Sequence, residues 1–166
     1  MRMVLDLLTG REDGYNVNKQ ARQEGIYSIN SYWMRMEKIG FVVISSYIPK
    51  DKNRTLFSIV GKSIKEICTK PVTAKYLKKE LHDLKSIYRR EWRSNERTNW
   101  VIDETLDDGK YQPLEYYLGI LKTITPEDIR QLAIRVFDCS KLNLYIYGEQ
   151  PDETDEELLD ILKCDH

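Results

Sequence analysis

The densest run of strand-forming residues in this chain lies between Gly25 and Ile48. β-Branched and aromatic residues fill two arms, 25–34 and 39–48, and a short charged segment at 35–38 separates them. Side chains of the first arm alternate between two faces, whereas the second arm is largely apolar on both faces at its centre. We therefore predict a β-hairpin whose second strand is interior and covered by helices on at least one side.

A third segment, 141–147, alternates apolar and polar residues and predicts a further strand with one buried face. Most of the remaining chain has apolar residues at spacings of three and four, which is typical of amphipathic helices. The expected fold class is α+β, with an antiparallel or mixed sheet and helices packed mainly on one face.

Helix-capping residues mark several boundaries in the sequence. Thr73 is expected to cap a long helix, and Thr125 with Pro126 at the first helical position is expected to start another. Thr154 and Glu157 have the spacing of a capping box. Further helices are expected over 1–9, 17–23, 96–108, from Pro113 onward, and over 51–68 with Asp51 as its cap.

Length and charge narrow the class of protein. A chain of 166 residues is long enough for one domain with a hydrophobic core, so we expect a single domain over 1–166. The formal net charge of −1 gives no reason to expect a nucleic-acid or anionic-membrane partner. The basic side of the 73–93 segment contains interleaved acidic residues, which favours a solvated helix face over a nucleic-acid site.

The apolar runs are short and interrupted, so neither a transmembrane helix nor a signal peptide is expected. Three well-separated cysteines, Cys68, Cys139 and Cys164, are typical of reduced thiols. We expect a cytoplasmic location, with an exported fragment lacking a leader as the alternative.

The chain contains few residues that could form an active site by themselves. His82 and His166 are the only histidines, and neither H-E-x-x-H nor H-x-x-E-H occurs. We interpret His82 as a helix-surface residue, and no cysteine has a context that supports a Cys–His nucleophilic pair. Glycine-rich phosphate loops are also missing from the sequence. We therefore expect the chain alone neither to bind zinc tightly nor to cleave peptides.

The order of the segments carries more information than any one of them. In this order the chain resembles a half-domain of the insulinase/pitrilysin family of zinc metallopeptidases, which includes the mitochondrial processing peptidases. The resemblance covers most of 3–148. It rests on the segments MVLDLLTG, ARQEGIYSI, GFVVISSYI, the long helix with Arg89-Arg90, ITPEDIRQLAIRVFD and LNLYIYGE.

The resemblance implies a non-catalytic role for this chain. Family members pair a half-domain that carries the inverted zinc motif with a half-domain that usually lacks zinc ligands and contacts the substrate. Because this chain lacks the motif, it resembles part of the second, C-terminal half. It would then hold peptide substrate and complete a cavity with a zinc-bearing half-domain or partner subunit. Zinc is accordingly expected on that partner and not on this chain.

The resemblance also indicates two substrate-binding candidates, Arg22 in ARQE and Tyr27 in GIYSI. A guanidinium can grip carbonyl or carboxylate oxygens, and a phenol can donate to a developing oxyanion. The two residues stand five positions apart, closer together than in the family. The alternative is that Arg22 is a loop charge and Tyr27 a packed strand aromatic. For the whole chain, the alternatives are a structural or protein-interaction module of the same fold without a peptidase role, and an unrelated α+β scaffold whose helix caps resemble those of the family.

Overall fold

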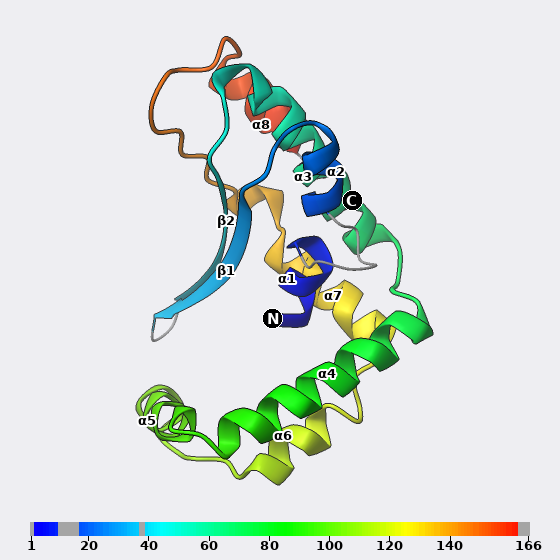
Figure 1. The fold of residues 1–166 in the computed structure, drawn as a ribbon, viewed down its shortest axis with the longest axis vertical. Helices are drawn as coiled ribbons and strands as arrows, with labels where there is room; N and C mark the ends of the chain where they lie inside the picture. Colours follow the sequence, from blue (N-terminus) through cyan, green and yellow to red (C-terminus); the bar gives the residue numbers. More distant parts are fainter. Residues whose placement is uncertain (1, 10–16, 37–38, 163–166) are drawn as a thin grey trace. The chain divides into compact units, whose positions relative to one another are not determined.

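The structure is a computed structural model that describes residues 2–9, 17–36 and 39–162. Most described residues are helical, and a small antiparallel sheet makes the class α+β, as the sequence predicts (Figure 1). The elements in chain order are α1 (Arg2–Thr9), α2 (Val17–Gln23), β1 (Ile29–Met36), β2 (Ile39–Ser46), the 3-10 turn η1 (Lys50–Lys52), α3 (Asn53–Thr69), α4 (Ala74–Trp92), α5 (Glu96–Asp108), α6 (Leu114–Ile120), α7 (Pro126–Val136), the 3-10 turn η2 (Cys139–Lys141) and α8 (Asp155–Leu162).

Several predicted helix boundaries are confirmed at atomic detail. The Thr73 hydroxyl accepts a hydrogen bond of 3.2 Å from the amide of Tyr76, so this cap starts α4 as expected. The capping box of α8 also forms, because the Thr154 amide donates to Glu157 Oε2 at 2.8 Å and the Glu157 amide donates to the Thr154 hydroxyl at 3.3 Å. The Asp51 cap is wrong: Asp51 lies within η1, and α3 begins at Asn53.

The predicted third strand is also wrong. Residues 142–147 follow the turn η2 without pairing to another strand, and the sheet contains β1 and β2 alone among the described residues. Alternation indicates only that a segment can place one face against a core. A strand also needs a neighbour with which to share backbone hydrogen bonds. Without such a neighbour, Tyr145 and Tyr147 are largely exposed.

The second hairpin strand is not the interior strand that its composition predicts. β2 pairs with β1 in antiparallel register, with Ile29 opposite Ser46 and Met36 opposite Ile39. Phe41 remains 43% exposed and Ile39 69% exposed, so neither lies in a covered core. The apolar centre of this strand reflects β propensity on a half-buried surface and not burial on both faces.

The described chain forms two compact units, one of residues 1–72 and 127–166 and one of residues 73–126. The single-domain organisation expected from length stays a prediction. The first unit is built around α3, which packs against α1, α2, η1 and α8. The buried residues of α3 are Asn53, Leu56, Phe57, Val60, Gly61, Ser63, Ile64, Ile67 and Cys68.

Arg130 joins α7 to the last turn of α3 within the first unit. Its Nη1 donates to the Cys68 carbonyl at 3.3 Å, a group that helix ends often leave without an intrahelical partner. Its Nε and Nη2 donate to Glu127 at 2.8 and 2.6 Å. Hydrogen bonds from Arg130, and next from Gln131, lower the pKa of Glu127 to about 2, so this carboxylate stays ionised above that pH.

Gly61 allows α3 and α8 to approach closely. A Cβ at this position would lie 2.6 Å from the backbone oxygen of Ile161 and 3.4 Å from the Cα of Leu162. On the facing helix, Leu158 and Leu162 are 0% and 7% exposed, so their side chains fill the contact. The two helices lie side by side in Figure 1.

The second unit contains α4, α5 and α6. Leu77, Leu84 and Leu121 are buried in it. Tyr88 and Tyr117 make an edge-to-face contact with ring centroids 6.3 Å apart. One turn further along α4, Trp92 stacks on Tyr111 at 5.8 Å, and the Arg97 guanidinium lies over the Trp92 ring at 5.2 Å from its centroid.

Replacing Gly61 by alanine is expected to destabilise the first unit. Alanine normally favours a helix interior over glycine by roughly 0.5–1 kcal/mol. Here the added methyl group meets backbone atoms of α8, and overpacking of this kind costs roughly 1–3 kcal/mol. The measurement is the free energy of urea unfolding, together with hydrogen exchange of the α8 amides, which is expected to become faster.

Ser58→Ala is the matched control, because Ser58 is an exposed position of the same helix. It is expected to leave stability unchanged or slightly higher. A Gly61→Ala protein as stable as Ser58→Ala would show that α3 and α8 are not in such close contact.

Candidate functional site

The turn between α2 and β1 positions both sequence-predicted site residues. The amide of Ile26 donates to the Ala21 carbonyl at 2.8 Å, and the amide of Gly25 donates to the Arg22 carbonyl at 3.1 Å. These two bonds form a Schellman motif, with Gly25 in the left-handed conformation at φ 78°. Ile26 and Ala21, both buried, supply the apolar contact that accompanies such an ending.

Arg22 and Tyr27 flank this turn and are both exposed. Arg22 lies in the last turn of α2, one residue before its end. Tyr27 is 75% exposed and precedes β1 by two residues, so it is not a strand residue as predicted. The strand starts later than expected because the left-handed Gly25 and the buried Ile26 belong to the helix ending. Tyr27 is therefore not a packed strand aromatic. Its role in substrate binding stays a prediction.

One face of the hairpin is open to solvent. Tyr32 and Met34 of β1 lie opposite Val43 and Phe41 of β2, so these four side chains share a face. Tyr32, Met34 and Phe41 are 46%, 42% and 43% exposed. The opposite face meets α1, where the hydroxyls of Thr9 and Ser31 are hydrogen-bonded. We call the residues Tyr32, Met34, Phe41 and Val43 the open hairpin face.

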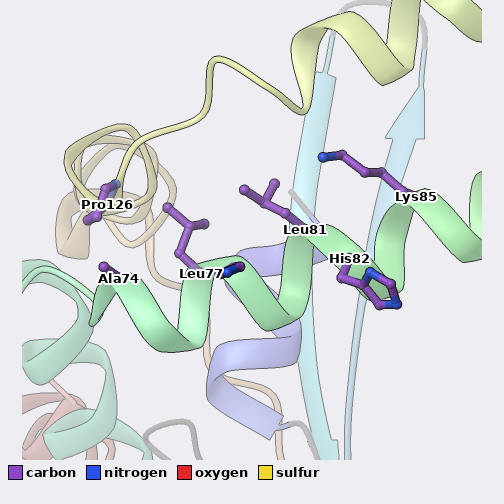
Figure 2. Close-up of a pocket in the computed structure, with 7 residues that line it drawn as sticks. Ala74, Leu77, Leu81, His82, Lys85 and Pro126 are labelled. Atoms are coloured by element: carbon purple, nitrogen blue, oxygen red, sulfur yellow. The ribbon is translucent and has the colours of Figure 1, made fainter.

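A shallow groove of about 350 Å³ lies on the second unit. Its lining residues are Ala74, Leu77, Lys78, Leu81, His82, Lys85 and Pro126, and we call this set the α4 groove. Figure 2 shows Leu77, Leu81 and Lys85 projecting from one side of α4, with Pro126 beyond Leu77 and the His82 ring to another side of the helix. The groove thus combines an apolar floor with basic residues at its margin.

Sequence reasoning missed the open hairpin face and the α4 groove. The sequence predicts a buried strand for the apolar second arm and a solvated face for the basic side of α4. Composition cannot distinguish a covered apolar residue from an exposed one, because the difference depends on which elements pack against it. The regular spacing of Leu77, Leu81 and Lys85 was the available signal for the groove.

The groups that could act as nucleophiles or metal ligands are poorly placed for those roles. His82 is exposed on α4, as interpreted from the sequence. Burial raises the pKa of the Cys68 thiol to about 11, the Cys139 thiol adds to the rise, and Arg130 opposes it. Cys68 is therefore a protonated thiol at neutral pH and a poor nucleophile. Within the described ranges, no three His, Cys, Asp or Glu residues gather as a metal site would require.

Comparisons with protein-family models and with curated proteins find no match to this chain. In the part of the chain that the structure describes, no helix has both the length and the apolar character needed to cross a bilayer. The resemblance to the insulinase/pitrilysin family therefore rests on the order of the sequence segments.

Replacing Gly25 by alanine is expected to destabilise the turn that holds Arg22 and Tyr27. A Cβ at Gly25 would meet nothing within 4 Å, so the cost is conformational and not steric. Holding a non-glycine residue in the left-handed region costs roughly 1–2 kcal/mol. The measurement is the urea unfolding free energy followed by circular dichroism.

Gly119→Ala is a suitable control, since a Cβ there also meets nothing within 4 Å but the backbone φ is not positive. That change is expected to be neutral or slightly stabilising. Equal effects of the two substitutions would contradict the Schellman ending at Gly25.

Proposed function

We propose that this chain is the non-catalytic, substrate-binding half of an insulinase-type zinc metallopeptidase. It holds peptide substrate and completes a cavity with a zinc-bearing half-domain or partner subunit. Zinc held by that partner would supply the activation of water for peptide-bond hydrolysis. The compartment in which this occurs is proposed to be the cytoplasm.

The exposed phenol of Tyr27 is the observation that carries the proposal. Tyr27 is 75% exposed, and what distinguishes it from other exposed tyrosines such as Tyr145 is its position directly after the hydrogen-bonded helix ending. Two backbone hydrogen bonds and the buried Ile26 fix the chain just before it. A hydroxyl donor held on a defined backbone suits the stabilisation of negative charge that develops on a carbonyl oxygen.

Arg22 supports the same proposal from the helix side of the turn. Its backbone carbonyl is an acceptor in the Schellman motif, so the residue is anchored while its side chain is exposed. A guanidinium can donate two parallel hydrogen bonds to a carboxylate, and single bonds to peptide carbonyls. Arg22 would therefore contribute to substrate binding more than to the chemical step.

The second candidate is a structural or protein-interaction module without a peptidase role. The open hairpin face favours it, because three large apolar side chains in one patch are typical of a surface that another protein covers. The two candidates differ in what the neighbouring coding sequence should contain. An H-x-x-E-H segment in the same locus supports the peptidase half, and its absence from the locus favours the interaction module.

Tyr27→Phe is expected to lower turnover of the reconstituted pair by roughly a hundredfold or more, because it removes one donor to the oxyanion. The ring is retained, so substrate contact through apolar surface should persist. The measurement is kcat for a good peptide substrate, with this chain mixed with its zinc-bearing partner. The chain without that partner is expected to show no turnover.

Tyr145→Phe is the matched control, since Tyr145 is 84% exposed in the same unit but lies far along the chain from the turn at Gly25. Its kcat should equal that of the unmodified chain. Unchanged turnover in Tyr27→Phe, with an unchanged circular dichroism spectrum, would argue for the interaction module.

Arg22→Ala is expected to raise KM with a smaller effect on kcat, because the lost bonds hold the ground state and the transition state alike. Arg22→Lys should recover only part of the binding, since lysine cannot make the bidentate contact. Steady-state kinetics over a range of peptide concentrations separates the two parameters. A fall in kcat at unchanged KM would contradict a binding role for Arg22.

A further inference from the structure

The α4 groove has an uncompensated positive charge. Across α4 the sequence AKYLKKELHDLKSIYRREW contains six Lys or Arg residues and three Asp or Glu residues. Among the described residues, neither Lys78 nor Lys85 makes an ion pair, although both line the groove. An occupant of this groove should therefore have an apolar stripe and acidic flanks.

Helix α5 of the same unit has this chemistry. Its sequence ERTNWVIDETLDD contains five acidic residues and one basic residue. Ile102 and Leu106 are spaced by four, so they lie on one face of the helix, and they are 49% and 78% exposed. Leu77 of the groove is buried, whereas Leu81 and Lys85 are half-buried, so Leu81 and the aliphatic part of Lys85 offer the apolar surface that an α5 side chain can cover.

The acidic helix α8 is excluded as the occupant. It is also acidic and amphipathic, but its apolar residues Leu158 and Leu162 are already buried where it packs against α3. Ile102 and Leu106, in contrast, remain exposed in the chain that carries them, so α5 is not seated in the groove of its own molecule. Neither the α4 groove nor the exposed face of α5 is covered within one copy, so a second copy can cover both.

We propose that this chain self-associates through its second unit, with the exposed face of α5 from one copy seated in the α4 groove of another. Because the groove and the helix occur in every copy, two such contacts can form around a two-fold axis and close the assembly as a dimer. Both surfaces belong to residues 73–126, so the pairing does not depend on the first unit. The interface places Ile102 and Leu106 on Leu81 and the aliphatic part of Lys85, and the opposite net charges of α4 and α5 favour the contact.

Sedimentation equilibrium of the purified chain from micromolar to near-millimolar concentration tests the proposal. The unmodified chain should form a dimer. Leu106→Ser should raise the dissociation constant of that dimer by about tenfold or more, because a buried apolar contact is lost. Lys78→Glu/Lys85→Glu should raise it at least as much, because the groove would then carry negative charge, as α5 does. Added salt should weaken the unmodified dimer, since the facing charges lie at the surface.

Ile120→Ser and Lys122→Glu are the matched controls, because both positions are exposed in the same unit and neither lines the groove. They should leave the dissociation constant unchanged. Circular dichroism and the unfolding midpoint of every variant show whether the fold is retained. A monomer at all concentrations, or a dimer that these variants affect no more than the controls do, would overturn the proposal.

A mixing experiment identifies the two surfaces as partners of each other. The Lys78→Glu/Lys85→Glu chain keeps an intact α5, and the Leu106→Ser chain keeps an intact groove. Their mixture should form a heterodimer with one of its two contacts complete, more tightly than either variant pairs with itself. Failure of the mixture to associate better than its components would overturn the pairing. So would binding of an acidic helical peptide in the groove of a chain that does not dimerise.

Discussion

The close approach of α3 and α8 is the constraint on which the first unit depends. Helix α3 has neighbours on several sides. On the side that faces α8, Gly61 has no side chain, so the backbones of the two helices come close together. The other buried residues of α3 include larger ones, such as Leu56 and Ile67, and α3 also packs against α1, α2 and η1. Helix α8 thus packs against a helix from the first half of the chain, and residues 73–126, which come between them in the sequence, form a compact unit of their own.

The boundaries that the sequence predicted correctly depend on interactions between near neighbours. Thr73, and Thr154 with Glu157, satisfy amide groups within three residues, so their pattern is sufficient to locate a helix start. The strand 141–147 depended on a partner elsewhere in the chain, and its alternation contains no information about that partner. The second hairpin strand shows the same limit, because its apolar residues do not reveal whether anything covers them.

The candidate site contains both residues that the sequence indicated and structural details that it could not predict. The segment resemblance indicated Arg22 and Tyr27, and the structure places them on either side of a turn that Gly25 makes possible. The sequence could not predict that Tyr27 lies outside the strand, because the helix ending extends through Ile26. It also could not predict the α4 groove, which requires Pro126 from the start of α7 as well as the leucines of α4.

The hairpin also affects how the chain would behave when it is produced alone. Arg35 is the sole charged residue in the sequences of β1 and β2, and each strand has one paired edge in the described structure. Natural sheets commonly protect such edges with lysine, proline or a bulge. A two-stranded ribbon without these features is a template for further strands during refolding. The protein concentration sets how often the ribbons of different copies meet. The yield from refolding should therefore depend more on protein concentration than on the stability of the helices around the ribbon.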